Sequence, residues 1–130
     1  MQSGHGWGDD FAMYIHHAKN IAEHKPYSET GYIFNDLAPT YSPDHYPPGF
    51  PVILSFIYAI WGLNYNAMHS MLILFLIWFL WLIFILFRNK LPFIFIALTI
   101  GLIGCSPGAW GLNDEIVSDL PAACFVLLFF

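Results

Sequence analysis

Residues 71–87 read MLILFLIWFLWLIFILF and contain no polar side chain beyond the indole N–H groups of Trp78 and Trp81. With Ala67 to Ser70 added, the apolar stretch covers 87 − 67 + 1 = 21 residues. A helix of this length rises about 31 Å, which matches the hydrocarbon thickness of a bilayer. A buried helix in a soluble protein is the alternative, but it needs a larger core than 130 residues supply. The stretch therefore predicts a membrane-spanning helix at about 67–87.

The composition of the whole chain agrees with this prediction. Of its 130 residues, 58% are hydrophobic, 19% are aromatic and only 10% are charged. A soluble domain averages about 45–50% apolar and about 25% charged residues. The formal net charge is −5, and the chain has four Lys and Arg residues in total, so it has no basic face that could neutralise phosphates. The composition indicates a chain solvated partly by lipid and excludes nucleic acid as a partner.

Two further apolar runs follow the first. One predicts a span at about 91–107, whose far end is loosened by glycine and proline at 101, 104, 107 and 108. The other, at 116–130, stops with the chain and predicts a truncated span, so we expect the sequence to be the N-terminal part of a longer protein. The expected fold is an all-α, polytopic helical membrane protein.

The short link Arg88-Asn89-Lys90 orients the expected spans. It holds two of the four basic residues of the chain, and short loops rich in Lys and Arg stay on the cytoplasmic side. The first span then runs from outside to inside. Residues 1–65 form a first external segment, 66–130 hold the transmembrane helices, and 108–115 form a second external loop. The expected location is the cell (inner) membrane, crossed several times.

The external segment is predicted to contain two helices. Asp9 and Asp10 precede apolar residues at helical spacing, so either carboxylate can cap this amphipathic helix, which Pro26 ends. The apolar members of its face are Phe11, Tyr14, Ile15, Ala18, Ile21 and Ala22. Pro51 to Trp61 is too short to cross a bilayer and predicts an interfacial or a re-entrant helix. Gly62-Leu63-Asn64 predicts a stop and a turn before the first span.

The segment Tyr46-Pro47-Pro48-Gly49-Phe50-Pro51 carries three prolines. Proline fixes φ and removes an N–H donor, so we expect a stiff extended turn that is not helical. Such a turn either holds His45 and the following helix at a fixed angle to the membrane, or only starts a helix.

The acids of the two external regions could carry chemistry. Two carboxylates above a membrane-embedded site suit general-base work on a hydroxyl, or a divalent cation held against a phosphate. By spacing alone, Gly8-Asp9-Asp10 favours a turn followed by a helix cap over a chemical role. Asp119 begins an apolar run, where an acid is costly unless it faces a polar cavity. His5, His16, His17 and His24 are expected to be solvated or interfacial.

The order of these pieces resembles a known family. Gly8-Asp9-Asp10 opens an amphipathic helix, Tyr46-Pro47-Pro48 follows about 35 residues later, and membrane spans come next. A second acidic loop, Asn113-Asp114-Glu115, leads into Ser118-Asp119-Leu120-Pro121. This order is similar to the first external loop and early helices of the membrane-embedded GT-C glycosyltransferases. The nearest group is the bacterial dolichyl-phosphate-mannose-protein mannosyltransferase-like and aminoarabinose-transferase-like proteins.

The resemblance implies transfer of a sugar from a polyprenyl-phosphate donor to an acceptor on the non-cytoplasmic side. It implies that Asp9 is the general base that activates the acceptor hydroxyl, with Asp10 beside it. It places Asp114 and Glu115 at a divalent cation or the donor phosphate. The candidate substrate- and donor-binding residues are His45, Tyr46, Pro47 and Asp119. Two alternatives stay open: a non-catalytic membrane accessory or assembly protein, in which Asp9 only caps a helix, and an inactive gene fragment.

Overall fold

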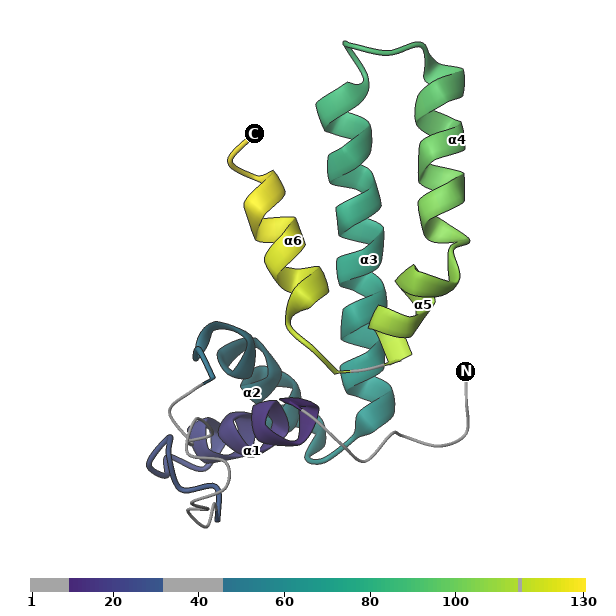
Figure 1. Ribbon diagram of the computed structural model, residues 1–130. Helices are drawn as coiled ribbons and strands as arrows, with labels where there is room; N and C mark the ends of the chain where they lie inside the picture. The colour runs from purple at the N-terminus through teal and green to yellow at the C-terminus, as the bar shows by residue number, and fades with distance from the viewer. Residues whose placement is uncertain (1–9, 32–45, 115) are drawn as a thin grey trace, which may run out of the picture. The chain divides into compact units, whose positions relative to one another are not determined.

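A computed structural model describes residues 10–31, 46–114 and 116–130, and every regular element in these ranges is an α-helix (Figure 1). The all-α prediction is confirmed for these residues. The elements are α1 (Asp10–Ala22), α2 (Gly49–Trp61), α3 (Tyr65–Phe87), α4 (Phe93–Gly104), α5 (Pro107–Asp114) and α6 (Asp119–Leu127). Contacts divide the described residues into an N-terminal unit, ending at residue 68, and a C-terminal unit, beginning at residue 69.

Helix α1 carries the predicted apolar face. Phe11, Tyr14, Ile15 and Ala18 are buried, and α1 packs against α2. The helix ends at Ala22, before Pro26, because the chain turns at His24 with a positive φ of 56°. The Lys25 N–H donates to the Asn20 carbonyl at 2.8 Å and the His24 N–H to the Ile21 carbonyl at 3.2 Å. These two bonds form a Schellman motif, which satisfies carbonyls that the helix end leaves open.

Helix α2 corrects the prediction for the proline segment. The helix starts at Gly49, so Phe50 and Pro51 are helical rather than extended. Pro48 has φ −73° and ψ −11°, and its carbonyl accepts the Val52 N–H at 2.9 Å. The first N–H groups of any helix have no partner within it, so Pro51 removes a donor that α2 does not use. The prolines therefore start α2 instead of preventing it.

The predicted stop and turn at 62–64 is present. Gly62 has a φ of 64°, which favours glycine, and its N–H donates to the Tyr58 carbonyl at 2.8 Å. The Asn64 side-chain oxygen accepts the Ala67 N–H at 3.1 Å and caps α3. These bonds end α2 and begin α3 within three residues.

Helix α3 has 23 residues, which corresponds to about 34 Å. In the described part of the chain it is the one helix that is long and apolar enough to cross a membrane. It matches the span predicted at 67–87.

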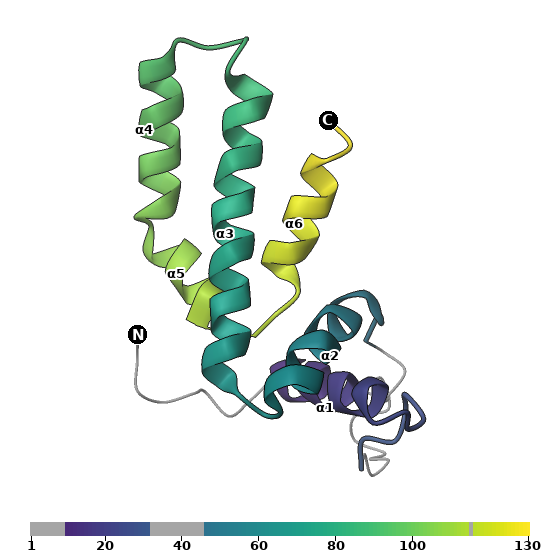
Figure 2. The same cartoon turned by 180° about the vertical axis from the view of Figure 1, so that it is seen from behind.

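Within the C-terminal unit, α4 runs antiparallel beside α3, and α6 lies on the other side of α3 (Figures 1 and 2). A side chain added at Gly104 would lie 3.3 Å from the Leu80 Cδ1 atom, so glycine permits this close approach. The Cys124 thiol donates to the Phe75 carbonyl at 3.3 Å, and Phe125 contacts the rings of Phe75 and Trp78.

The second and third predicted spans contain shorter helices than expected. Helix α4 has 12 residues and α6 has nine, and each is below the roughly 20 residues that a straight crossing needs. The loop predicted at 108–115 contains α5. The Ala109 N–H donates to the Ser106 hydroxyl at 3.1 Å, and Pro107 occupies the first helical position. Serine as cap followed by proline is a helix-start signal, which explains why α4 ends and α5 begins here.

Candidate functional site

The inner face of α1 is partly polar. His17 and Asn20 are buried together with the apolar residues of that face, and His17 has no exposed surface. Both side chains point to the turn that follows α1, where Tyr27 and Glu29 lie. The burial of His17 contradicts the prediction that it is solvated or interfacial. His16 and His24 are exposed, as expected, and His5 lies outside the described residues.

Tyr27 is the centre of the hydrogen bonds at this face. Its carbonyl oxygen lies 2.8 Å from His17 Nδ1 and 3.4 Å from Asn20 Nδ2. Asn20 Nδ2 also donates to the Glu29 carbonyl at 2.8 Å. The rings of His17 and Tyr27 stack with centroids 3.9 Å apart and planes 6° apart. The imidazole and the amide therefore hold the turn against α1.

The hydrogen bond to Tyr27 assigns the tautomer that a neutral His17 ring adopts. A carbonyl oxygen only accepts, so Nδ1 must carry the proton, and Nε2 of the neutral ring is an acceptor. This Nε2 atom is buried and has no hydrogen-bond partner among the residues that the structure describes. A buried polar atom without a partner is rare, so the position is chemically distinctive.

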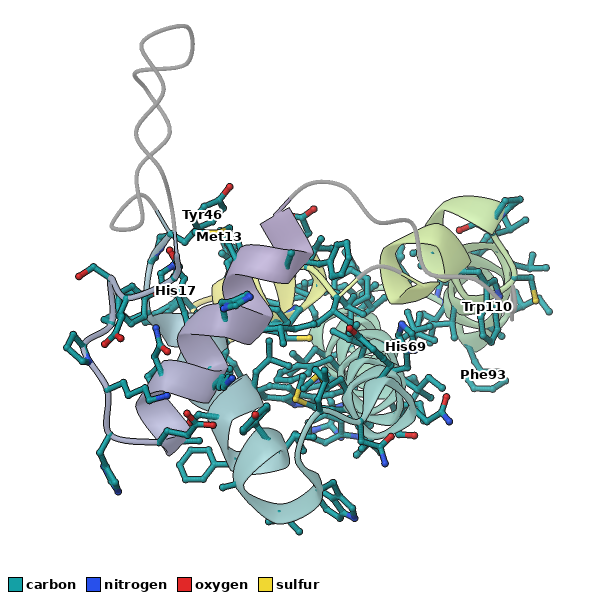
Figure 3. The ribbon with its side chains drawn as sticks, turned by 90° about the horizontal axis from the view of Figure 1, so that it is seen from below. Met13, His17, Tyr46, His69, Phe93 and Trp110 are labelled. Atoms are coloured by element: carbon teal, nitrogen blue, oxygen red, sulfur yellow. The ribbon has the colours of Figure 1, made fainter. Side chains whose placement is uncertain are left out.

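Tyr46, which lies three residues before α2, contacts the same group of residues. Its carbonyl accepts the Tyr27 hydroxyl at 2.7 Å. Its ring lies edge-on to Tyr14, with centroids 5.3 Å apart, and Tyr14 makes a second edge-on contact with Phe50 at 5.2 Å. Figure 3 shows His17 and Tyr46 on the same side of α1. We call Tyr14, His17, Asn20, Tyr27 and Tyr46 the tyrosine cluster.

The tyrosine cluster fixes the backbone that leads into α2. Tyr46 is buried, and Pro47 beside it is exposed. Since Tyr14 lies one turn after Asp10 on α1, the cluster joins the acidic start of α1 to the segment Tyr46-Pro47-Pro48. These two motifs were singled out by the sequence about 35 residues apart, and the structure packs their neighbourhoods into one unit.

The predicted acids are described only in part. Asp9, His45 and Glu115 lie outside the described residues. Asp10 is the first residue of α1 and Asp114 the last of α5, and only their backbone positions are described. An acid at the first position of a helix interacts favourably with the helix dipole.

Asp119 is the predicted acid whose side chain is described. It is exposed and is the first residue of α6, directly after Ser118. It belongs to the C-terminal unit, whereas Tyr46 and Pro47 belong to the N-terminal unit. Its position is that of an acid at a helix N-terminus, which also accounts for its place at the head of an apolar run. Among the side chains that the structure describes, no group of three or more His, Cys, Asp and Glu is arranged to hold a metal ion.

One ion pair lies at the end of α1. The Lys25 Nζ atom is 2.8 Å from a carboxylate oxygen of Glu23, and both side chains are partly exposed. The hydrogen bond from Lys25 lowers the pKa of Glu23, and the same bond raises the pKa of Lys25. In contrast, α2 contains no charged residue. The charged side chains that the structure describes in the N-terminal unit therefore lie on α1 and the turn after it.

Sequence reasoning missed His17, Asn20 and Tyr27 as members of a cluster. A signal was present, because 14, 17 and 20 recur every three residues beside the apolar positions 11, 15 and 18 of the same helix. The polar type of His17 led instead to a solvated or interfacial assignment, and Asn20 received no assignment.

Comparisons with known protein families, curated proteins and solved structures found no match to this chain. The likeness to GT-C glycosyltransferases thus depends on the order of motifs in the sequence.

Proposed function

We propose that this chain forms the first external segment and the early membrane helices of a glycosyltransferase that uses a polyprenyl-phosphate sugar. The observation that carries the proposal is the contact between Tyr14 and Tyr46, whose ring centroids are 5.3 Å apart. This contact supports the pairing of the acidic start of α1 with the Tyr-Pro-Pro segment, which is the most specific part of the resemblance. The unit that holds both motifs leads directly into α3.

The proposal includes several membrane crossings, beginning with α3. The helices of the C-terminal unit expose large apolar side chains, which lipid can cover at little cost. They include Leu74, Ile77, Trp81, Phe93, Ile94, Leu98, Leu102, Phe125 and Val126. Figure 3 shows Phe93 pointing away from its helix. With Arg88 and Lys90 on the cytoplasmic side, the acids at 9–10 and at 114–119 share the opposite side.

In the proposed reaction, Asp9 accepts the proton of the acceptor hydroxyl. The hydroxyl oxygen forms a bond to the anomeric carbon of the sugar, the bond from that carbon to the phosphate oxygen breaks, and polyprenyl phosphate leaves with the electron pair. Asp10 adds negative charge beside the base, and Tyr46 and Pro47 shape the mouth of the site. A divalent cation at Asp114 and Glu115 stays a prediction, and no step is routed through it.

The experiment replaces Asp9 or Asp10 by Asn in the full-length gene product, assayed in membranes with a panel of defined radiolabelled polyprenyl-phosphate sugars. A positioned general base contributes roughly 10²- to 10⁴-fold to a rate, so we expect Asp9→Asn to lower transfer by at least about 100-fold. Glu23→Gln is the matched control, because it makes the same acid-to-amide change on an exposed side chain. Turnover by Asp9→Asn at the level of Glu23→Gln would contradict the assignment of the base.

A non-catalytic accessory role is the second candidate, and the start of α1 at Asp10 favours it. If these acids serve only the helix N-terminus, Asp10→Asn lowers the stability of α1 slightly because it removes a charge from the positive end of the helix dipole. Asp9→Asn changes it little because Asn caps a helix as well as Asp does, and the unaltered protein transfers no sugar from any donor. Far-UV circular dichroism and thermal unfolding of the same variants separate this outcome from loss of a base.

A further inference from the structure

The N-terminal unit has two chemically different outer faces. Helix α1 exposes Ala12 and His16 along one strip, with Lys19 half-buried beside them, and the exposed Glu23 directly after the helix continues this strip. Helix α2 exposes Val52, Phe56, Ala59 and Ile60, and we call these four residues the outer face of α2. Phe56 is 66% exposed and Ile60 is 68% exposed. The strip of α1 carries polar and charged side chains that water can solvate, whereas the outer face of α2 has no polar side chain.

The outer face of α2 lies opposite the face that packs. Phe50, Pro51, Leu54 and Ser55 are buried, and α2 contacts α1. At 100° per residue, these positions and the outer face fall on opposite sides of the helix. An amphipathic helix in a soluble protein turns its polar side outward. Helix α2 instead has an apolar side within the unit and a second apolar side outside it.

The distribution of charge identifies the partner as lipid. Residues 46–87 contain no Asp, Glu, Lys or Arg, a run of 87 − 46 + 1 = 42 residues that includes both α2 and α3. The charged side chains described in this unit lie on α1 and the turn after it. The chain thus becomes uncharged at α2 and stays uncharged through the helix that is long and apolar enough to cross a membrane.

The short connection to α3 limits how far α2 can lie from a membrane that α3 enters. Three residues, Gly62 to Asn64, separate the two helices. Trp61 and Tyr65 are therefore four residues apart, and even an extended chain would span no more than about 14 Å between them. Tryptophan and tyrosine are enriched at the boundary between hydrocarbon and water. Trp61 is exposed and Tyr65 is half-buried.

We propose that the outer face of α2 is a lipid-binding surface that inserts into the interface of the bilayer, with the outer strip of α1 facing water. The inference rests on the membrane crossing by α3 in the proposed function and deepens it. Because α2 has no cationic side chain, its binding comes from buried apolar area and not from attraction to anionic headgroups. A neutral phosphatidylcholine surface is therefore sufficient.

The test measures whether lipid or water surrounds the outer face of α2 and the outer strip of α1. Single cysteines replace Val52, Phe56 and Ile60 on α2, His16 on α1 and Glu23 directly after α1. The background has Cys105 and Cys124 replaced by Ser and Ala. Each variant of the full chain is spin-labelled and placed in phosphatidylcholine nanodiscs, and its collision rates with oxygen and with a water-soluble nickel chelate are measured. Leu74→Cys and Ile77→Cys on α3 are the reference sites for lipid.

We expect oxygen to dominate at 52, 56 and 60, as at 74 and 77, and the nickel chelate to dominate at 16 and 23. Three separate α2 sites keep the test valid if one label disturbs packing, and circular dichroism identifies that variant. Adding phosphatidylglycerol or raising the salt concentration should leave the pattern unchanged. A gain of oxygen contact at the α2 sites that depends on phosphatidylglycerol would overturn the neutral-lipid proposal.

Other results separate the inference from the proposed function. Nickel access at the α2 sites, with oxygen dominant on α3, would overturn the lipid surface and leave the membrane crossing intact. Low collision with both reagents at 56 and 60 would mean that protein covers this face, which also overturns it. Nickel access at 74 and 77 would overturn the membrane crossing itself.

Discussion

The N-terminal and C-terminal units are both helical, but their helices are held by different interactions. In the N-terminal unit, α1 and α2 bury Phe11, Ala18 and Leu54, and the tyrosine cluster adds hydrogen bonds and stacked rings. In the C-terminal unit, large apolar side chains such as Leu74 and Leu102 are exposed. The comparison shows that polar and aromatic contacts tie the helices of the first unit together, whereas the second unit, which also buries Leu72 and Ile116, exposes more of its large apolar side chains.

The same substitution in the two units should have very different effects. Leu54 is fully buried, so Leu54→Ala should lower the free energy of unfolding by about 2–5 kcal/mol through lost contacts and a cavity. Leu74 is exposed, so Leu74→Ala should cost less than about 1 kcal/mol. Chemical unfolding in mixed micelles, followed by circular dichroism, measures both. Equal losses would remove the distinction between the units.

A charge in the middle of α3 should disturb the second unit more than a charge on α1. Ile77 is exposed near the centre of α3, and an arginine at the centre of a membrane helix costs about 2.5–3.5 kcal/mol on insertion scales. We expect Ile77→Arg to lower membrane insertion strongly, as measured by carbonate extraction. Ala12→Arg, on the outer strip of α1, is the control and should insert normally. If Ile77→Arg also inserts normally, water and not lipid contacts this side of α3.

The hydrogen bonds of the tyrosine cluster should contribute less than the apolar core but still measurably. Tyr27→Phe removes the donor to the Tyr46 carbonyl and should cost about 1–2 kcal/mol of unfolding free energy. Amide exchange at Val52, whose N–H donates to the Pro48 carbonyl, should also become faster, because the Tyr27 bond ties the backbone before Pro48 to the turn. Ser28→Ala, which removes an exposed hydroxyl from the next residue, should change neither quantity. Unaltered exchange in Tyr27→Phe would show that the cluster does not fix this segment.

The smallest expected change in stability comes from replacing two histidines of α1 and its turn by glycine, and the two changes should have opposite signs. His24 has a φ of 56°, where glycine is favoured, so His24→Gly should raise stability by about 0.5–1 kcal/mol. His16 lies in the middle of α1 on its exposed side, so His16→Gly should lower stability by about 0.5 kcal/mol. Thermal unfolding of the two variants checks the signs. Two changes of the same sign would mean that the turn at His24 does not carry this strain.

The parts of the fold that were predictable from the sequence are those with a long, uninterrupted pattern. The run at 67–87 predicts α3, and the spacing of Phe11, Tyr14, Ile15 and Ala18 predicts the buried face of α1. The predicted start of α2 at Pro51 was two residues late, because Tyr46 to Pro51 was expected to be extended, although the first turn of a helix tolerates proline. Helix α5 was missed within a predicted loop because Ser106-Pro107 was not taken as a cap and a first helical position.

The candidate site was less predictable, because burial of a polar side chain depends on partners distant in sequence. His17 is buried because the Tyr27 carbonyl, ten residues later, accepts a hydrogen bond from its Nδ1–H group, and no local spacing predicts that partner. The role of Asp9, Asp10, Asp114 and Glu115 stays a prediction, as it comes from the resemblance.

The most direct test of the central claim asks whether α3 separates two sides of a membrane. Cysteines replace His16 on the outer strip of α1 and Asn89 in the link after α3, each alone in the background without Cys105 and Cys124. Intact cells and inverted vesicles are treated with a membrane-impermeant maleimide. We predict labelling of His16→Cys in intact cells only and of Asn89→Cys in inverted vesicles only. Labelling of both positions from the same side would contradict a single crossing by α3.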